Sequence, residues 1–318
     1  MSWDSVGVAL PTPYRDIIHN RIVVITGVGR SGTTILSKLL GSYDNCYCLF
    51  EPAIFKYLLP KAIDNPSLKP VFWGTLVEDY LLPLVQGRGY STNPGDWTYH
   101  DNFLTRKRLG ECWGRGRRAE ALEYVIRDKP TFFVKSNELQ PLWRDIVDSG
   151  ILPGVGFLHI VRDGRDVTRS VMARGWYSDT YCSEMVDWTV EKWVTDKNAW
   201  IATKKYVPWF VEEKRVMEWV EWNLPTRIAY VWARLVREAG RMIPNAVRYE
   251  ELVSGPREVA GVLERMFGLI GKHTSLTTTH IESVLDFEKR DYGGWQEKYI
   301  EESVREEFWL EMKENGYG

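Results

Sequence analysis

A glycine-rich turn, GVGRSGTT at 27–34, follows the apolar run RIVVIT and precedes ILSKLLG, which has a helical pattern. Gly27 and Gly32 have the spacing of a P-loop, whose backbone N–H groups surround a phosphate at the N-terminus of the next helix. Thr33 stands where P-loop nucleotide hydrolases have lysine, and Thr34 keeps their hydroxyl. The pattern favours anion binding without the usual lysine, and a simple tight connection is the alternative.

Arg30, in the middle of this turn, can replace the missing lysine charge. A planar guanidinium can donate two parallel hydrogen bonds to a terminal phosphate or to a group attached to it. Without the lysine, ATP hydrolysis and kinase chemistry are less expected, and no convincing acidic strand end stands beside Thr34 to hold magnesium. The residues of the turn that we predict to bind the anion are Arg30, Ser31, Gly32, Thr33 and Thr34.

A second anion site is predicted in LHIVRDGRDVTRSV, where Arg162 ends an apolar run and Ser170 follows in the first turns of a helix. An arginine and a hydroxyl beside a helix N-terminus can form a phosphate pocket. The alternative is a lattice of ion pairs, in which Arg162, Asp163, Arg165 and Asp166 neutralise one another.

Strands that alternate with helices are expected to position both sites. Strands are predicted at RIVVIT, TFFVK, GVGFLHIV and AVRYEEL, and helices at TTILSKLLG, RDGRDVTRSVMARG and REVAGVLERMFG. This order predicts an α/β fold, a central parallel β-sheet flanked by helices, with ligands at the carboxyl ends of the strands. We expect a single domain, 1–318, with a nucleotide-binding core at 21–175 and 246–300 and a helical insertion at 176–245. His159, inside one strand, is expected to be a packed core histidine.

The charge of the whole chain is nearly balanced, so anion binding must come from local clusters. The 318 residues have a formal net charge of -2 and are 44% hydrophobic. This composition gives no general attraction to nucleic acid or anionic lipid. Four scattered cysteines without metal-ligand spacing favour a reducing compartment and no metal site. No window approaches the roughly 20 apolar residues of a membrane helix and no signal peptide is recognisable, which favours a cytoplasmic protein.

Two phosphate sites at one edge of a sheet suit a nucleotide with phosphates at two positions of its ribose. The sequence here resembles the sulfotransferase family, which uses 3′-phosphoadenosine 5′-phosphosulfate (PAPS) and has a P-loop-like fold. GRSGTT is similar to the family's 5′-phosphosulfate loop, and IVRDGRDVTRS, with its Arg-x7-Ser spacing, to its 3′-phosphate motif. VRYEEL is similar to the family's Tyr-Glu-Asp-Leu segment, and KRDYGGWQEKY loosely matches its late basic Gly-Trp loop. The resemblance covers roughly 22–55, 131–175 and 246–300. It implies nucleotide binding, without a metal, by the two anion sites and also by Tyr249, Lys289, Arg290, Gly293 and Gly294.

The same resemblance implies roles in sulfuryl transfer. Arg30 would stabilise charge on the leaving nucleotide, and Lys135 matches a lysine that points at the sulfonate in cytosolic members; a surface lysine is the alternative. The cytosolic members' Lys-Thr-His triplet reads KSN here, so their histidine base is absent. Another branch, which includes tyrosylprotein and glycan sulfotransferases, uses a glutamate, and LFEPA offers Glu51 in a comparable place. Alternatively, Glu51 caps the helix that begins near Pro52.

The acceptor has a weaker signature. Eight of the 15 tryptophans lie in 176–245, at spacings more typical of core packing than of a binding face. An open edge there would suit an aromatic, lipid or sugar acceptor. We expect transfer to a hydroxyl, less so to an amine, of a small-molecule, lipid or glycan acceptor. A P-loop kinase that uses magnesium ATP and a non-catalytic nucleotide-binding protein remain the alternatives.

Overall fold

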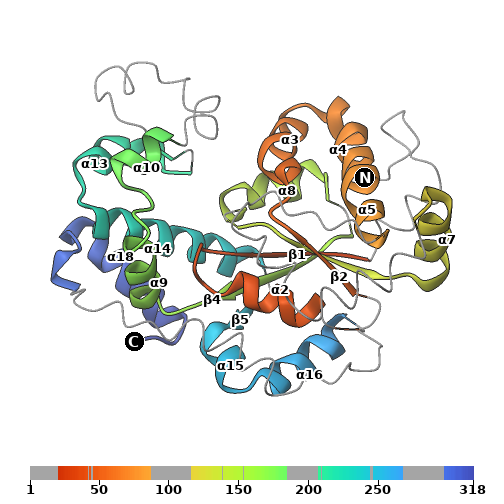
Figure 1. Cartoon of the computed structure of the whole chain (residues 1–318). Coiled ribbons are helices and arrows are strands. Elements are labelled where there is room, and N and C mark those ends of the chain that lie inside the picture. The colour runs from red at the N-terminus through yellow and green to blue at the C-terminus, as the bar shows by residue number, and fades with distance from the viewer. Residues whose placement is uncertain are drawn as a thin grey trace.

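The structure is a computed structural model (Figure 1). It describes residues 21–41, 43, 46–86, 116–137, 139–152, 154–184, 207–208, 210–243, 246–267 and 297–318. Five parallel strands form the central sheet in the order β2-β3-β1-β4-β5. Their bounds are β1 Ile22–Gly27, β2 Cys46–Phe50, β3 Thr131–Lys135, β4 Gly156–Val161 and β5 Ala246–Arg248. The predicted α/β fold with a central parallel sheet is therefore confirmed.

The strand order places both anion motifs beside one crevice. β1 pairs with β3 on one side and with β4 on the other. The chain leaves β1 toward β2 and β3, and later crosses back over β1 to reach β4 and β5. In parallel sheets, ligands bind beyond the carboxyl ends of the strands at such a reversal. The turn after β1 and the segment after β4 both lie at this edge.

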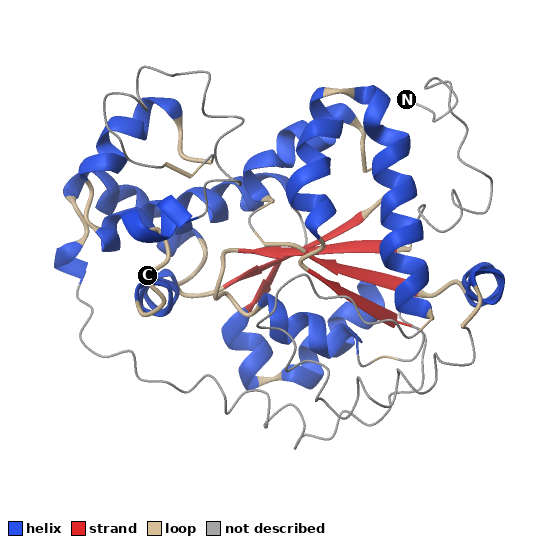
Figure 2. Ribbon diagram, turned by 45° about the horizontal axis from the view of Figure 1, so that its top comes forward, coloured by secondary structure: helices blue, strands red, loops and turns tan. Residues whose placement is uncertain are grey.

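Helices connect the strands and cover both faces of the sheet (Figure 2). Their bounds are α2 Thr33–Gly41, α3 Ala53–Asp64, α4 Lys69–Thr75, α5 Leu82–Val85, α7 Arg118–Asp128, α8 Trp143–Ser149, α9 Gly164–Met172, α10 Asp179–Glu184, α13 Val216–Glu221, α14 Leu224–Met242, α15 Tyr249–Ser254, α16 Pro256–Phe267 and α18 Glu302–Glu314. Ile22 and Val24 of β1 face a core with α3, α4 and α8, whereas Val23 and Ile25 face one with α2 and α16. This alternation is the two-residue period of a strand. Among the residues that the structure describes, none of the helices is long and apolar enough to span a membrane.

A third apolar cluster joins α9, α14 and α18 beside β4. The expected insertion at 176–245 supplies α10, α13 and α14, and three of its tryptophans, Trp219, Trp222 and Trp232, are buried. For these three, core packing is confirmed. Ala239, further along α14, belongs to the core that covers the sheet, so α14 ties this region directly to the sheet.

The fourth predicted strand, AVRYEEL, is shorter than expected. β5 ends at Arg248 and α15 begins at Tyr249, so the prediction is wrong beyond Arg248. Glu250 and Glu251 stand in the first turn of α15, where negative side chains interact favourably with the helix dipole. As a result, Tyr249 and Glu250 lie at the carboxyl edge of the sheet, next to the two anion motifs.

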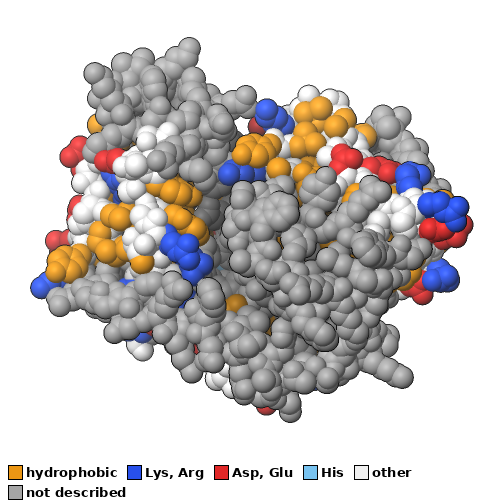
Figure 3. All heavy atoms as spheres, viewed as in Figure 1, with side chains coloured by type: hydrophobic (Ala, Val, Ile, Leu, Met, Phe, Trp, Pro, Cys, Tyr) orange, Lys and Arg blue, Asp and Glu red, His pale blue; other side chains and the backbone are white. Residues whose placement is uncertain are grey.

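Charged side chains around α7 form pairs on the surface. Arg117 pairs with Glu120 and Arg118 pairs with Glu78, and Figure 3 shows basic and acidic side chains mixed at this edge of the molecule. Exposed pairs of this kind are screened by water and contribute little to stability.

Candidate functional site

The turn after β1 has the backbone of an anion-binding loop. Arg30 and Gly32 have φ angles of 73° and 94°, and α2 begins directly afterwards at Thr33. A Cβ atom on Gly27 would lie 2.8 Å from the carbonyl oxygen of Ile160, so only glycine lets the turn approach β4 this closely. Arg30 is a non-glycine residue in the left-handed region, which is rarely occupied without a tertiary reason.

Ser31 is fully buried in this turn, and its hydroxyl has no hydrogen-bond partner among the residues that the structure describes. A buried polar group left unsatisfied costs about 1–3 kcal/mol. Phosphate or sulfonate oxygens are strong acceptors, so an anion in the turn would give this hydroxyl a partner. The N-terminus of α2 adds its positive dipole end at the same place. The turn therefore fits the predicted phosphate group; Thr34, in the first turn of α2, is half-buried.

The two anion motifs meet at the edge of the sheet. Arg30 Nε donates to Ser170 Oγ at 3.0 Å, although the two residues are 140 positions apart. Arg162 Nη1 donates to the carbonyl oxygen of Arg30 at 3.2 Å. Arg162 follows β4 and Ser170 lies in α9, so the strand and helix of the second motif both contact the first. Two guanidinium groups and a hydroxyl thus converge where the sequence predicted two separate pockets.

Tyr249 brings a third sequence motif to the same place. The guanidinium carbon of Arg162 lies 4.1 Å from the centre of the Tyr249 ring, a cation–π contact. A Cβ atom on Gly32 would lie 2.4 Å from this ring, so the turn and the tyrosine are in close contact. The segment at 247–252 that resembles the family's Tyr-Glu-Asp-Leu stretch is therefore part of the site.

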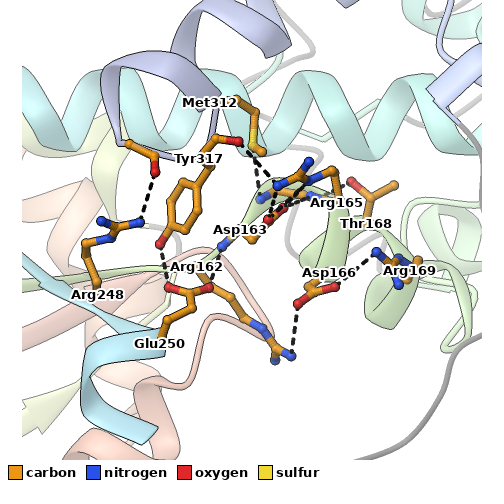
Figure 4. A network of polar contacts seen from close by, with 12 residues as sticks. Arg162, Asp163, Arg165, Asp166, Thr168, Arg169, Arg248, Glu250, Met312 and Tyr317 are labelled. Carbon is orange, nitrogen blue, oxygen red and sulfur yellow. Dashed lines mark hydrogen bonds and ion pairs between the residues drawn. The ribbon is translucent and has the colours of Figure 1, made fainter. Parts of the chain in front are cut away.

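The ion-pair lattice considered as an alternative is present in part (Figure 4). Arg165 binds Asp163 at 2.6 Å, and Arg169 lies 3.2 Å from Asp166. Arg162 is 3.9 Å from Asp166, at the limit of an ion pair, and points away from Asp163. The ion pairs therefore join Arg165 and Arg169 to the two aspartates. Arg162 has closer contacts with the turn and with Tyr249 than with Asp166.

Glu51 and Lys135 form an ion pair at the ends of β2 and β3. Lys135 Nζ lies 2.5 Å from Glu51 Oε1, and the two side chains are 5% and 27% exposed. The surface-lysine alternative is therefore wrong. Pro52, not Glu51, is the N-cap residue of α3, and it makes no side-chain capping hydrogen bond. The Glu51 carboxylate accepts a hydrogen bond from Lys135. Glu51 has a φ of 43°, and its N–H donates to the carbonyl of Lys135 at 2.8 Å, which fixes it beside β3.

Asn137 occupies the position of the histidine in the triplet discussed above. Its Oδ1 accepts a hydrogen bond from Thr33 Oγ1 at 2.9 Å. The amide thus ties the end of β3 to the start of α2 and cannot act as a proton acceptor for catalysis. His159 is buried in β4, and burial lowers its pKa from 6.5 to about 4. The prediction of a packed core histidine is confirmed.

Some site residues lie outside the described part of the chain, and others were missed. Lys289, Arg290, Gly293 and Gly294 lie outside the described residues. Sequence reasoning missed Trp232, whose Nε1 donates to the carbonyl oxygen of Arg162 at 3.1 Å. It also missed Glu250, whose carboxylate accepts from the N–H of Asp163 at 3.0 Å. Its place in the Tyr-Glu-Asp-Leu-like segment was a signal for Glu250, whereas nothing near Trp232 marked it.

Comparison with known proteins gives matches among solved structures. No protein-family model and no curated protein matches the chain. The sulfotransferase domain of the Synechococcus PCC 7002 olefin synthase is 14% identical, with a TM-score of 0.46 over 94% of this chain and 96% of that one. The sulfotransferase domain from the curacin biosynthetic pathway is also 14% identical, with a TM-score of 0.45 over 94% and 98%. A Mycobacterium avium sulfotransferase is 13% identical, with a TM-score of 0.40 over 93% and 77%. These three solved structures are named as sulfotransferases, the family that the motifs resemble.

Proposed function

We propose that this chain is a sulfotransferase that moves a sulfuryl group from PAPS to a hydroxyl group of a small-molecule, lipid or glycan acceptor. The observation that carries the proposal is the direct contact between the two anion motifs, through Arg30, Ser170 and Arg162. Both motifs lie at the crevice between β1 and β4, where one nucleotide can reach them together. Two basic groups at one site match a nucleotide with phosphates on both sides of its ribose.

In this proposal the turn at 27–34 binds the 5′-phosphosulfate, and Arg162 with Ser170 binds the 3′-phosphate. Arg30 lies between them and donates to Ser170 through Nε. A guanidinium carries five N–H donors in a planar fork, so one arginine can bind a phosphate and a hydroxyl together. The late loop with Lys289, Arg290, Gly293 and Gly294 is included on the resemblance of its sequence alone.

Glu51 is the proposed base and Lys135 its positioning partner. The hydroxyl oxygen of the acceptor attacks sulfur while its proton passes to the Glu51 carboxylate, and the bond from sulfur to the 5′-phosphate oxygen breaks. The products are the sulfate ester and 3′-phosphoadenosine 5′-phosphate (PAP). Arg30 and the N-terminus of α2 stabilise the charge that grows on the leaving phosphate. Lys135 holds the Glu51 carboxylate at the carboxyl ends of β2 and β3.

Nucleotide binding by the Arg162→Ala variant tests this proposal. We expect the Kd of PAP to rise about 10- to 100-fold, the range expected for loss of a hydrogen-bonded charge. The Kd of adenosine 5′-monophosphate, which lacks only the 3′-phosphate, should rise far less, because Arg162 contacts the 5′-phosphate turn through the carbonyl oxygen of Arg30 and is not proposed to bind the 5′-phosphate itself. Both are measured by calorimetry. Arg118→Ala, which removes an exposed arginine paired with Glu78, is the matched control.

Two results would contradict the proposal. Equal weakening of both nucleotides would show that Arg162 supports the fold of the site and does not bind a 3′-phosphate. A wild-type chain that ignores PAP but binds magnesium ATP would instead favour the kinase alternative.

A further inference from the structure

The residues that follow α18 lie against the junction between β4 and α9 (Figure 4). The hydroxyl of Tyr317 is 2.7 Å from Glu250 Oε2 and 3.4 Å from the carbonyl oxygen of Val161. A hydroxyl has one proton, so the shorter contact identifies Glu250 as its acceptor. The other carboxylate oxygen, Glu250 Oε1, accepts from the backbone N–H of Asp163 at 3.0 Å. One carboxylate therefore links Tyr317 to the residue next to Arg162.

Tyr317 is itself fixed by several contacts. Its side chain is buried, and Arg248 lies over its ring at 4.5 Å from the ring centre. The carbonyl oxygen of Gly316 accepts from Arg248 at 3.2 Å, and that of Tyr317 accepts from Arg165 at 3.2 Å. Burial, together with the hydrogen bond to Glu250, raises the pKa of Tyr317 above its ordinary value of 10. The hydroxyl therefore remains a hydrogen-bond donor at neutral pH.

Glu250 is joined to Arg162 from two directions. Through Asp163 N–H it fixes the backbone directly after Arg162. Through its neighbour Tyr249, the first residue of α15, it fixes the ring that lies 4.1 Å from the Arg162 guanidinium. A shift of Glu250 would therefore move both the backbone and the aromatic surface that orient this side chain. Tyr317 is the side chain that holds the far side of the Glu250 carboxylate.

From this arrangement we infer that Tyr317, acting through Glu250, is a positioning residue for Arg162 and sets how strongly the site prefers a nucleotide that carries a 3′-phosphate. The inference rests on the proposed function, in which Arg162 binds that phosphate. Neither Tyr317 nor Glu250 touches the nucleotide in this account. They act because Arg162 can bind a phosphate well only when its direction is fixed in advance.

The Tyr317→Phe variant tests the inference, because it keeps the ring and removes only the hydroxyl. We expect the Kd of PAP to rise about 10-fold, comparable to the loss of one hydrogen bond to a charged group. The Kd of adenosine 5′-monophosphate should not change. The affinity for PAP divided by that for adenosine 5′-monophosphate, called the ratio below, should therefore fall. Tyr230→Phe is the matched control, since it removes a buried hydroxyl that accepts from Glu212 N–H at 3.2 Å on another part of the molecule. That variant should keep the wild-type ratio.

Glu250→Gln is the second variant, and it also serves if Tyr317→Phe does not fold. The amide oxygen can still accept from Asp163 N–H or from Tyr317, but the charge is lost, so the ratio should fall less than in Glu250→Ala. A ratio that stays at the wild-type value in both Tyr317→Phe and Glu250→Gln, with only a lower Tm, overturns the inference. If Arg162→Ala still lowers the ratio in that case, the proposed function stands. A wild-type chain with no preference for PAP overturns both.

Discussion

The two ends of the proposed site are built in different ways. The reacting end, defined as Glu51 and Lys135, is held by partners on neighbouring strands: the two side chains bind each other across the ends of β2 and β3. The phosphate end, defined as Arg162 and Ser170, is held by α14, α15 and residues after α18, through Trp232 and Glu250 among others. The pairing of β2 with β3 positions the reacting end, whereas the phosphate end requires the packing of distant helices.

This difference separates the effects expected of substitutions at the two ends. A change at the reacting end should alter the chemical step with little effect on nucleotide affinity, because Glu51 and Lys135 pair with each other at the ends of adjacent strands. A change in the supports of the phosphate end should alter nucleotide affinity and the free energy of unfolding together, because the same helices form the core.

The largest effect is expected from Glu51→Gln, which keeps the shape of the side chain but removes its ability to accept a proton. Turnover should fall about 10²- to 10⁴-fold, the typical contribution of a positioned general base, while the Kd of PAP stays unchanged. Steady-state rates with a hydroxyl acceptor and calorimetry with PAP provide the two measurements. Glu78→Gln, at the exposed pair with Arg118, is the control. Unchanged turnover in Glu51→Gln would mean that another residue is the base, and that Glu51 and Lys135 do not form the reacting end.

A smaller effect is expected from acid, through His159 in β4, the strand that leads to Arg162. Its pKa is lowered by burial from 6.5 to about 4, so the unfolded chain binds the proton more strongly. The free energy of unfolding should therefore fall as pH drops from about 6.5 to 4, by at most about 3 kcal/mol in total. Urea unfolding of the wild type and of His159→Leu across this range measures the difference. The same pH dependence in both proteins would show that His159 is not its source.

The smallest of the three effects is expected from Gly164→Ala, at the start of α9 in the phosphate end. The added Cβ would lie 2.8 Å from both Trp232 and Phe308, two buried aromatic side chains. Overpacking of this kind costs about 1–3 kcal/mol, and PAP affinity should fall with it because Trp232 also supports Arg162. Gly240→Ala, in α14 with open space around it, should instead stabilise by up to about 1 kcal/mol. If Gly164→Ala changed neither the free energy of unfolding nor the PAP affinity, Trp232 and Phe308 would have to move aside easily.

Much of the fold was predictable because it depends on local patterns. The β-branched run before Gly27 and the apolar run before Arg162 became β1 and β4, and α2 begins at Thr33 as predicted. The prediction that the strand continues through Tyr249 was wrong. The apolar residues at the start of AVRYEEL indicate a strand, but they do not show where the strand ends and α15 begins. The anion-binding role proposed for Arg30 came from its place in the glycine-rich turn, whereas its contact with Ser170 was not predicted.

The sequence by itself determined the parts of this protein that depend on residue type and short spacing: the glycine-rich turn, the arginine that replaces its lysine, and the strands that present them. Tertiary structure alone decided which distant groups meet. Arg30 hydrogen-bonds to Ser170, and Glu51 forms an ion pair with Lys135. Tyr317 hydrogen-bonds to Glu250, which in turn binds the backbone next to Arg162. The reason is physical, because spacing along the chain fixes the direction of a side chain only within one element, and contacts between elements depend on how the whole core packs.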